Sequence, residues 1–163
     1  MEAKDVAQVV LIGVGATAVM DIWLLLLLGL KVQPPNFALI GRWVGNMRRG
    51  QFAHASIAEA SPVANELGLG WLTHYAVGIA YAFLLVAVLG TGWSRQPSFL
   101  PALSVGVGTV LAPLFVMQPA MGAGFAASKT PTPLKNCLRS LVNHVVFGTG
   151  LYLAALGIEW ISR

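Results

Sequence analysis

Charged side chains are scarce in this sequence. Only 10% of its 163 residues are Asp, Glu, Lys or Arg, whereas 56% are hydrophobic. Soluble domains carry about 25% charged residues, because polar groups have to cover their surface. This chain has too little charge to cover a globule of its own size, so lipid is the solvent that its apolar surface requires. We therefore predict an integral membrane protein whose first partner is the lipid bilayer.

Cysteine is nearly absent as well, since Cys137 is the only one in the sequence. A lone cysteine excludes an intramolecular disulfide and a cluster of thiolate metal ligands. The formal net charge of +4 is also small, and loops that flank membrane spans often carry such an excess. No basic run is dense enough to follow a phosphate backbone. We predict no nucleic-acid partner.

Long apolar runs, in contrast, are abundant. A helix that crosses a hydrocarbon layer of about 30 Å needs roughly 20 apolar residues, and four segments qualify: 6–30, 67–89, 100–117 and 138–158. Small residues recur four apart in them, a spacing typical of closely packed membrane helices. The pairs are Gly13/Thr17, Gly78/Ala82, Ala102/Gly106, Ser104/Gly108 and Gly150/Ala154. The sequence predicts an all-α integral membrane fold, a four-transmembrane-helix bundle that forms a single membrane domain over 1–163.

The connection between the first two spans, residues 31–66, is long and polar and contains an amphipathic stretch. Its apolar residues share one helical face: Phe37, Ile40, Trp43, Val44 and Met47. The opposite face carries Arg42, Asn46 and Arg49. This pattern predicts a short helix that lies in the headgroup region of the membrane. Tryptophans near the predicted interfaces are expected to anchor the protein there; they are Trp43, Trp71, Trp93 and Trp160.

The basic residues predict the orientation of the chain. Seven of the ten lie in the first and third connections or at their edges: Lys31, Arg42, Arg48, Arg49, Lys129, Lys135 and Arg139. The other side has three, namely Lys4, Arg95 and Arg163. Because cytoplasmic loops carry the excess of Lys and Arg, we expect these two connections in the cytoplasm and both termini in the periplasm.

Polar side chains within the spans all fall in the half of the membrane next to these two connections. At about 1.5 Å rise per residue, Asp21 lies roughly 14 Å from the nearer loop end of its helix. An ionised Asp costs about 2.5–3.5 kcal/mol at the centre of a span, so it should find a partner. His74, His144 or an arginine of the first connection would serve. The candidate ligand- or proton-binding residues are Asp21, His74, His144, Asn143, Glu66 and Gln118, and the first connection adds Arg42 and His54.

These residues leave two classes of function open. In the first, the protein moves protons, ions or a small solute, because histidine changes charge near neutral pH. Four short spans enclose only a narrow pathway, so this hypothesis predicts a homo-oligomer. In the second, the protein is a structural or accessory membrane protein, and its polar residues only hold the helices together.

A third alternative is a haem or metal binder. His74 and His144 would be the axial ligands of a b-type haem. The same histidines with Asp21, Glu66 and His54 supply ligand types for a divalent metal. No compact ligand spacing supports either group, so we predict no cofactor. The sequence also contains no catalytic motif, and we predict no catalytic residue.

A series of short strings along the chain carries a resemblance to a known family. They are Met20–Trp23, Asn36 with Gly41–Trp43, Gly50–His54, Gly70–Tyr75, Met117–Pro119 with Gly122 and Gly124, and Ser140-Leu141 followed by His144. In this order the chain resembles, over nearly its whole length, an uncharacterised family of small bacterial membrane proteins, the domain of unknown function 2938. The resemblance implies a multi-pass protein of the bacterial inner membrane. It implies no activity, ligand or site residue.

Overall fold

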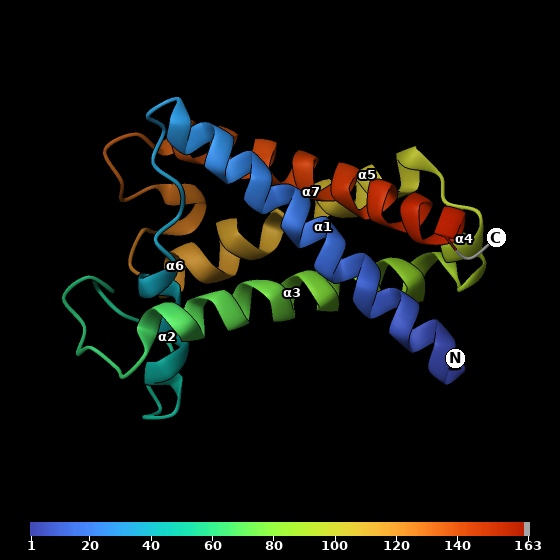
Figure 1. Ribbon diagram of the computed structural model, residues 1–163. Helices are drawn as coiled ribbons and strands as arrows, with labels where there is room; N and C mark the ends of the chain where they lie inside the picture. Colours follow the sequence, from blue (N-terminus) through green and yellow to red (C-terminus); the bar gives the residue numbers. More distant parts are fainter. Residues whose placement is uncertain (162–163) are drawn as a thin grey trace. The chain divides into compact units, whose positions relative to one another are not determined.

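The computed structural model describes residues 1–161, and these residues form helices and connections without a strand (Figure 1). Four helical segments are long and apolar enough to cross a membrane: Ala3–Gly29, Glu66–Leu89, Phe99–Ala120 and Pro133–Ile161. They confirm the four predicted spans. Arg163, which the orientation argument counts, lies outside the described residues.

The elements follow one another along the chain as α1 (Ala3–Gly29), α2 (Phe37–Met47), α3 (Glu66–Leu89), α4 (Gly92–Arg95), α5 (Phe99–Gly108), η1 (Pro113–Met117), α6 (Gln118–Ala120), η2 (Phe125–Ala127) and α7 (Pro133–Ile161). The last helix begins five residues before the predicted span. Proline suits the first turn of a helix because its missing N–H has no intrahelical partner there. The backbone carbonyl of Thr132 accepts the N–H of Asn136, and so α7 starts at Pro133.

The helices are divided between two compact units. Unit one comprises Met1–Pro34, Tyr75–Thr109 and the chain from Asn143 onward, and unit two comprises Pro35–His74 and Val110–Val142. Both units draw on residues that are far apart in the sequence. The single membrane domain expected from the sequence stays a prediction, and each unit is described by itself.

Unit one takes a stretch from each of the four spans and packs them around one core. Its buried hydrophobic residues are Val9, Ile12 and Ala16 of α1, Ala82, Leu85 and Val86 of α3, Trp93 of α4, Ala102 of α5, and Phe147, Leu151 and Ala155 of α7. This packing is consistent with the predicted four-helix bundle. The prediction of Trp93 as a membrane anchor is wrong, because its ring is buried in this core and its Nε1–H donates to the carbonyl of Ser98 (3.3 Å).

Small residues let the backbones of unit one approach closely. A Cβ atom added to Gly13 would lie 2.5 Å from the Cα of Ile79, and one added to Gly106 would overlap the Cα of Gly148. Contacts of this kind need glycine because any side chain would push the helices apart. One predicted pair fails, since Ser104 and Gly108 are both exposed. Spacing of small residues alone does not say which helix face meets a neighbour.

Unit two contains the predicted amphipathic helix, α2, packed against the first turns of α3. An added Cβ at Gly41 would overlap the carbonyl of Glu66, and one at Gly70 would overlap the carbonyl of Phe37. The buried face of α2 differs from the prediction, because Asn46, expected on the polar face, is fully buried. Its side-chain amide can be buried because it donates to the carbonyls of Arg42 and Ser61, both at 3.0 Å.

The third span is a broken helix rather than a regular one. Pro113 has no N–H to donate to the preceding turn, and the helix continues past it as a π-helical turn over Pro113–Met117. The turn ends where the N–H of Gln118 donates to the carbonyl of Pro113. Such turns occur frequently at functional sites, and this one leads directly to a candidate residue.

Candidate functional site

Three candidate residues of unit one, Asp21, Asn143 and His144, form polar contacts between its helices. Tyr75 Oη–H donates to the carboxylate of Asp21 at 2.7 Å, between α3 and α1. The Trp23 Nε1–H donates to Asn143 Oδ1 at 3.0 Å, between α1 and α7. A third contact joins His144 of α7 to the end of α5. Asp21 and Asn143 therefore each have a hydrogen-bond partner on another helix, as predicted for polar residues within a span.

His144 lies against the end of α5. Its Nδ1 is 2.9 Å from Thr109 Oγ1 and 3.3 Å from the carbonyl of Gly106. The ring of Tyr81 packs beside it, with the two ring centroids 6.4 Å apart. The side chain of His144 thus holds α7 to α5 through polar atoms that would otherwise be costly to bury.

The sequence did not identify two of the partners, Tyr75 and Trp23. Both carry one polar atom on a large apolar ring, so they look like ordinary membrane residues in a sequence. A buried Tyr or Trp usually finds a hydrogen-bond partner for that atom. Their positions beside His74 and two residues after Asp21 were the available signal.

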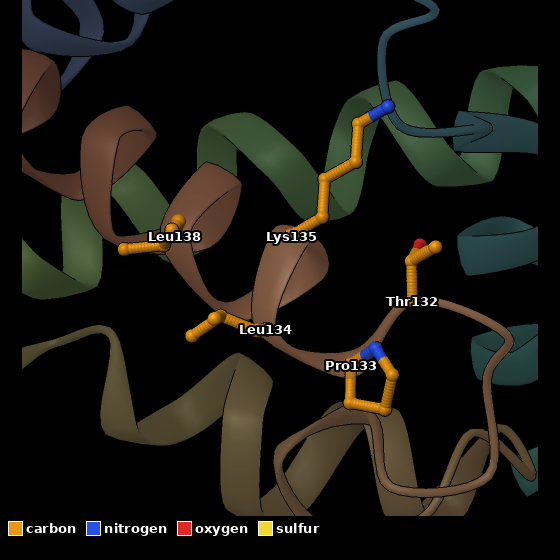
Figure 2. A pocket seen from close by; sticks show the side chains of 5 residues that line it. All are labelled: Thr132, Pro133, Leu134, Lys135 and Leu138. Carbon is orange, nitrogen blue, oxygen red and sulfur yellow. The ribbon is translucent and has the colours of Figure 1, made fainter.

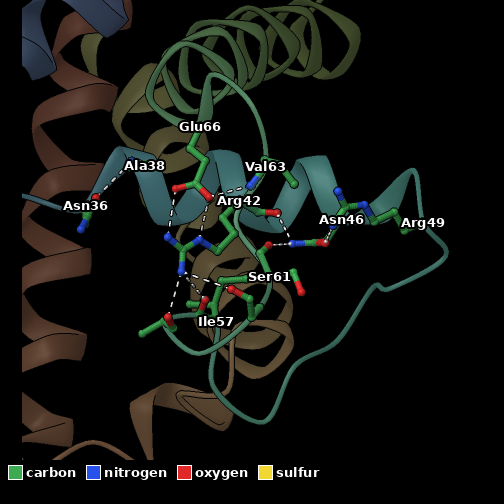
Figure 3. Close-up of polar contacts among 11 residues, drawn as sticks. Asn36, Ala38, Arg42, Asn46, Arg49, Ile57, Ser61, Val63 and Glu66 are labelled. Atoms are coloured by element: carbon green, nitrogen blue, oxygen red, sulfur yellow. Dashed lines mark hydrogen bonds and ion pairs between the residues drawn. The ribbon is translucent and has the colours of Figure 1, made fainter.

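In unit two, the side chain of Arg42 organises the connection between α2 and α3 (Figure 3). Its Nε and Nη2 donate to the two carboxylate oxygens of Glu66, at 2.8 and 3.1 Å. Its Nη1 donates to the carbonyl of Ala58 at 2.8 Å and lies near those of Ile57 and Ala60. The hydrogen bond with Glu66 raises the pKa of the Arg42 guanidinium.

Glu66 is equally engaged, because Oε1 also accepts the backbone N–H of Val63 at 2.9 Å. The side chains of Arg42 and Glu66 are only 16% and 15% exposed. All three guanidinium nitrogens and both carboxylate oxygens therefore have partners within the protein. This pair, predicted as two separate candidates, fixes the fold of residues 57–66 and offers little to a ligand.

The hydrogen bonding of His54 and Gln118 differs from that of Arg42 and Glu66. The N–H of His54 donates to the carbonyl of Ala120 at 2.8 Å, and that of Ile57 donates to Met121 at 3.1 Å, so the two segments are bound together. Within residues 1–161, the buried atoms His54 Nε2 and Gln118 Oε1 have no hydrogen-bond partner. Leaving such an atom without a partner costs about 1–3 kcal/mol.

His74 stands in an aromatic group of unit two. Its ring centroid lies 4.8 Å from that of Phe37 and 5.8 Å from that of Trp71. Phe37 and Trp71 are themselves stacked, with centroids 4.4 Å apart. The group joins the start of α2 to α3, which gives the His74 ring a packing role in addition to its predicted polar one.

In the part of the chain that it describes, the structure does not support the metal-binding alternative. No group of three or more His, Cys, Asp or Glu side chains in residues 1–161 is close enough to hold a metal ion. Cys137 Sγ donates instead to the carbonyl of Ala126 at 3.1 Å.

A comparison with protein families matches one family over most of the chain. A family model described as "Protein of unknown function (DUF2938)" matches residues 10–158, nearly the whole chain. The chain belongs to this family. No curated protein and no solved structure matches it.

This DUF2938 protein thus has three kinds of polar residue. Those of unit one link helices in pairs, and Arg42 with Glu66 and Asn46 shapes the connection in unit two. Only His54 and Gln118 keep a buried polar atom that the described residues leave without a partner. We take these two as the centre of the candidate site.

Proposed function

We propose that this membrane protein binds a small polar solute beside His54 and Gln118, as a step in moving that solute across the membrane. The observation that carries the proposal is the pair of buried atoms without partners, His54 Nε2 and Gln118 Oε1. Buried polar atoms in native proteins nearly always have a partner, so an exception calls for an explanation such as a bound molecule.

The chemistry of the two atoms suggests the class of solute. The amide oxygen of Gln118 only accepts hydrogen bonds, whereas a ring nitrogen of His54 accepts or donates according to its tautomer. A solute with an N–H or O–H group would satisfy Gln118. Amines, amides and polyols fit this description, and an amine would also link binding to protons.

The backbone around the two residues supports a binding role. Gln118 directly follows the π-helical turn Pro113–Met117. Gly122, at a φ of +95°, lies so close to Ala55 that an added Cβ would overlap its carbonyl. A positive φ and such a close approach both favour glycine. The two segments are therefore held against each other by their backbones, which leaves their side chains available.

The test is a thermal-shift measurement on the purified chain with methylammonium, acetamide and glycerol as probes. We expect at least one probe class to raise the melting temperature of the wild type but not that of Gln118→Leu or His54→Phe. Gln51→Leu is the matched control, because Gln51 is exposed in the same unit. No shift with any probe, or equal shifts in all variants, would reject the proposal.

Transport requires a further measurement in liposomes. The probe that shifts the melting temperature is loaded on one side, and its flux is followed with and without a pH gradient. Loss of flux in Gln118→Leu with unchanged folding supports transport. Because four spans enclose a narrow pathway, we also propose a homo-oligomer, to be checked by chemical cross-linking in the membrane.

The proposed location is the bacterial inner membrane, with the connections 31–66 and 118–137 in the cytoplasm. The excess of basic residues in these connections supports this orientation. Alkaline phosphatase fused to the C-terminus should be active, since that enzyme works in the periplasm. A fluorescent C-terminal fusion that folds only in the cytoplasm should stay dark, and the reverse result would invert the topology.

A second candidate function, a structural or accessory membrane protein, has its own supporting observation. Asp21, Asn143 and His144 each bond to a neighbouring helix in unit one. These contacts are what helix packing alone would require. If Asp21→Asn lowers stability and the wild type shows neither binding nor flux, this candidate is the better account.

A further inference from the structure

The start of α7 carries a groove that the proposed solute site does not use (Figure 2). Thr132, Pro133, Leu134, Lys135 and Leu138 line an open hollow of about 410 Å³. Its wall is mainly apolar, and its two leucines are exposed, Leu134 at 73% and Leu138 at 52%. In Figure 2, the two leucines extend in another direction than Lys135 and Thr132, so these two polar side chains border the apolar groove.

The length of α7 places this groove at the boundary of the membrane. A helix of 29 residues is about 44 Å long at roughly 1.5 Å per residue. The hydrocarbon layer is about 30 Å thick. Roughly four or five residues at each end of α7 therefore extend into the headgroup layer. Thr132 and Lys135 lie at that depth, and Leu138 lies where the hydrocarbon begins.

The polar border of the groove favours an anion. The first turn of a helix leaves backbone N–H groups without intrahelical partners, and these attract negative charge. Residues 118–142 contain Lys129, Lys135 and Arg139 but no Asp or Glu. Within residues 1–161, none of these three basic side chains forms an ion pair. The positive charge of Lys135 is thus available to a partner outside the chain.

From these features we infer that the groove binds one acidic phospholipid. Its phosphate lies between the Lys135 ammonium and the Thr132 hydroxyl, and an acyl chain follows Leu134 and Leu138 into the hydrocarbon. The polar side chains at the border of the groove thus contact the phosphate, and its leucines contact the acyl chain. Free phosphate would leave the leucines uncovered, and a zwitterionic lipid would bring its own cation next to Lys135.

The experiment uses the full chain in an uncharged detergent. Native mass spectrometry counts bound lipid during titration with dioleoylphosphatidylglycerol and, separately, dioleoylphosphatidylcholine. One lysine near an anionic lipid surface contributes enough to change binding by about fivefold. We expect Lys135→Gln to weaken phosphatidylglycerol binding by that factor and Lys135→Arg to retain it. Lys4→Gln is the charge-matched control, because Lys4 is exposed on α1 and lies outside the groove.

Leu134→Ser tests the apolar half. This side chain is largely exposed, so the variant should fold, and circular dichroism checks that it does. We expect weaker phosphatidylglycerol binding than in the wild type. The inference is wrong if Lys135→Gln binds like Lys4→Gln, if the two lipids bind equally, or if excess inorganic phosphate displaces the lipid as well as phosphatidylglycerol itself does.

Discussion

Arg42 donates hydrogen bonds from Nε and Nη2 to the two carboxylate oxygens of Glu66, at 2.8 and 3.1 Å. Its third nitrogen, Nη1, donates to the carbonyl of Ala58 at 2.8 Å. Planar, two-pronged contacts of this kind suit the guanidinium group and are stronger than single hydrogen bonds. One side chain of α2 thereby holds both the first residue of α3 and the loop before it.

Arg42→Ala should lower the melting temperature by several degrees, because it removes the donor to Glu66 Oε2 and to the carbonyl of Ala58 and one of the two donors to Glu66 Oε1. Arg42→Lys should recover only part of the loss, since an ammonium does not match the two carboxylate oxygens. Arg48→Ala is the control, because Arg48 is exposed at the end of the same helix. Equal melting temperatures for Arg42→Ala and Arg48→Ala would contradict the role of this contact.

The same pair predicts how stability responds to alkaline pH. The hydrogen bond with Glu66 raises the pKa of Arg42. A base whose pKa is raised on folding contributes stability that is complete below its ordinary pKa and lost only above the raised one. The difference in melting temperature between wild type and Arg42→Ala should therefore stay constant from neutral pH to about pH 10. A difference that shrinks over this range would show that the contact is not a stable ion pair.

Gly41→Ala and Gly70→Ala should each destabilise unit two. In both, the new Cβ would overlap a backbone carbonyl of the facing helix, and such overpacking costs about 1–3 kcal/mol. Gly157→Ala is the control, because nothing lies within 4 Å of its added Cβ, and alanine favours a helix by about 0.5–1 kcal/mol over glycine. Thermal unfolding of the three variants in detergent measures the contrast. The close packing of α2 on α3 is refuted if all three behave alike.

Gln118→Leu should stabilise the protein in the absence of solute. Its Oε1 is buried without a partner in residues 1–161, so an apolar replacement removes a cost of about 1 kcal/mol or more. Residues that serve function often carry such a cost, and replacing them trades activity for stability. A clear fall in melting temperature would mean instead that Gln118 has a structural partner.

Trp23→Phe should destabilise unit one only slightly. It removes the hydrogen bond to Asn143 and keeps most of the ring's packing. Hydrogen bonds between membrane helices contribute about 0.6 kcal/mol on average. The double variant Trp23→Phe with Asn143→Ala should lose less than the sum of the two single variants. Strict additivity of the two losses would show that the two side chains do not interact.

Much of this fold follows from composition and hydropathy. Four apolar runs and one amphipathic stretch gave the spans and α2, because a helix that crosses lipid has to be long, apolar and internally hydrogen-bonded. The ends of the spans were less predictable. The start of α7 depends on Pro133 and on the carbonyl of Thr132. The mean hydropathy of a segment does not reveal such a local helix start.

The candidate residues were recognised by type, but their roles depended on contacts between distant parts of the chain. The sequence marked Arg42, Glu66, Asn143 and Gln118 alike as polar groups near the connections. In the structure, the first three are bonded to neighbours, whereas Gln118 keeps a buried atom without a partner among the described residues. The spacing of residues in the sequence does not reveal which polar atoms are paired. Arg42 and Glu66 are 24 residues apart and Trp23 and Asn143 are 120 apart, yet both pairs are in contact.

The sequence by itself thus determined that this protein belongs in a membrane and where its helices run, because burial of apolar side chains in lipid depends on local composition. The tertiary structure decided which polar atoms are satisfied. That outcome depends on distances of about 3 Å between residues that only folding brings together. It also buried Trp93 and Asn46, two residues whose sequence positions pointed to the surface.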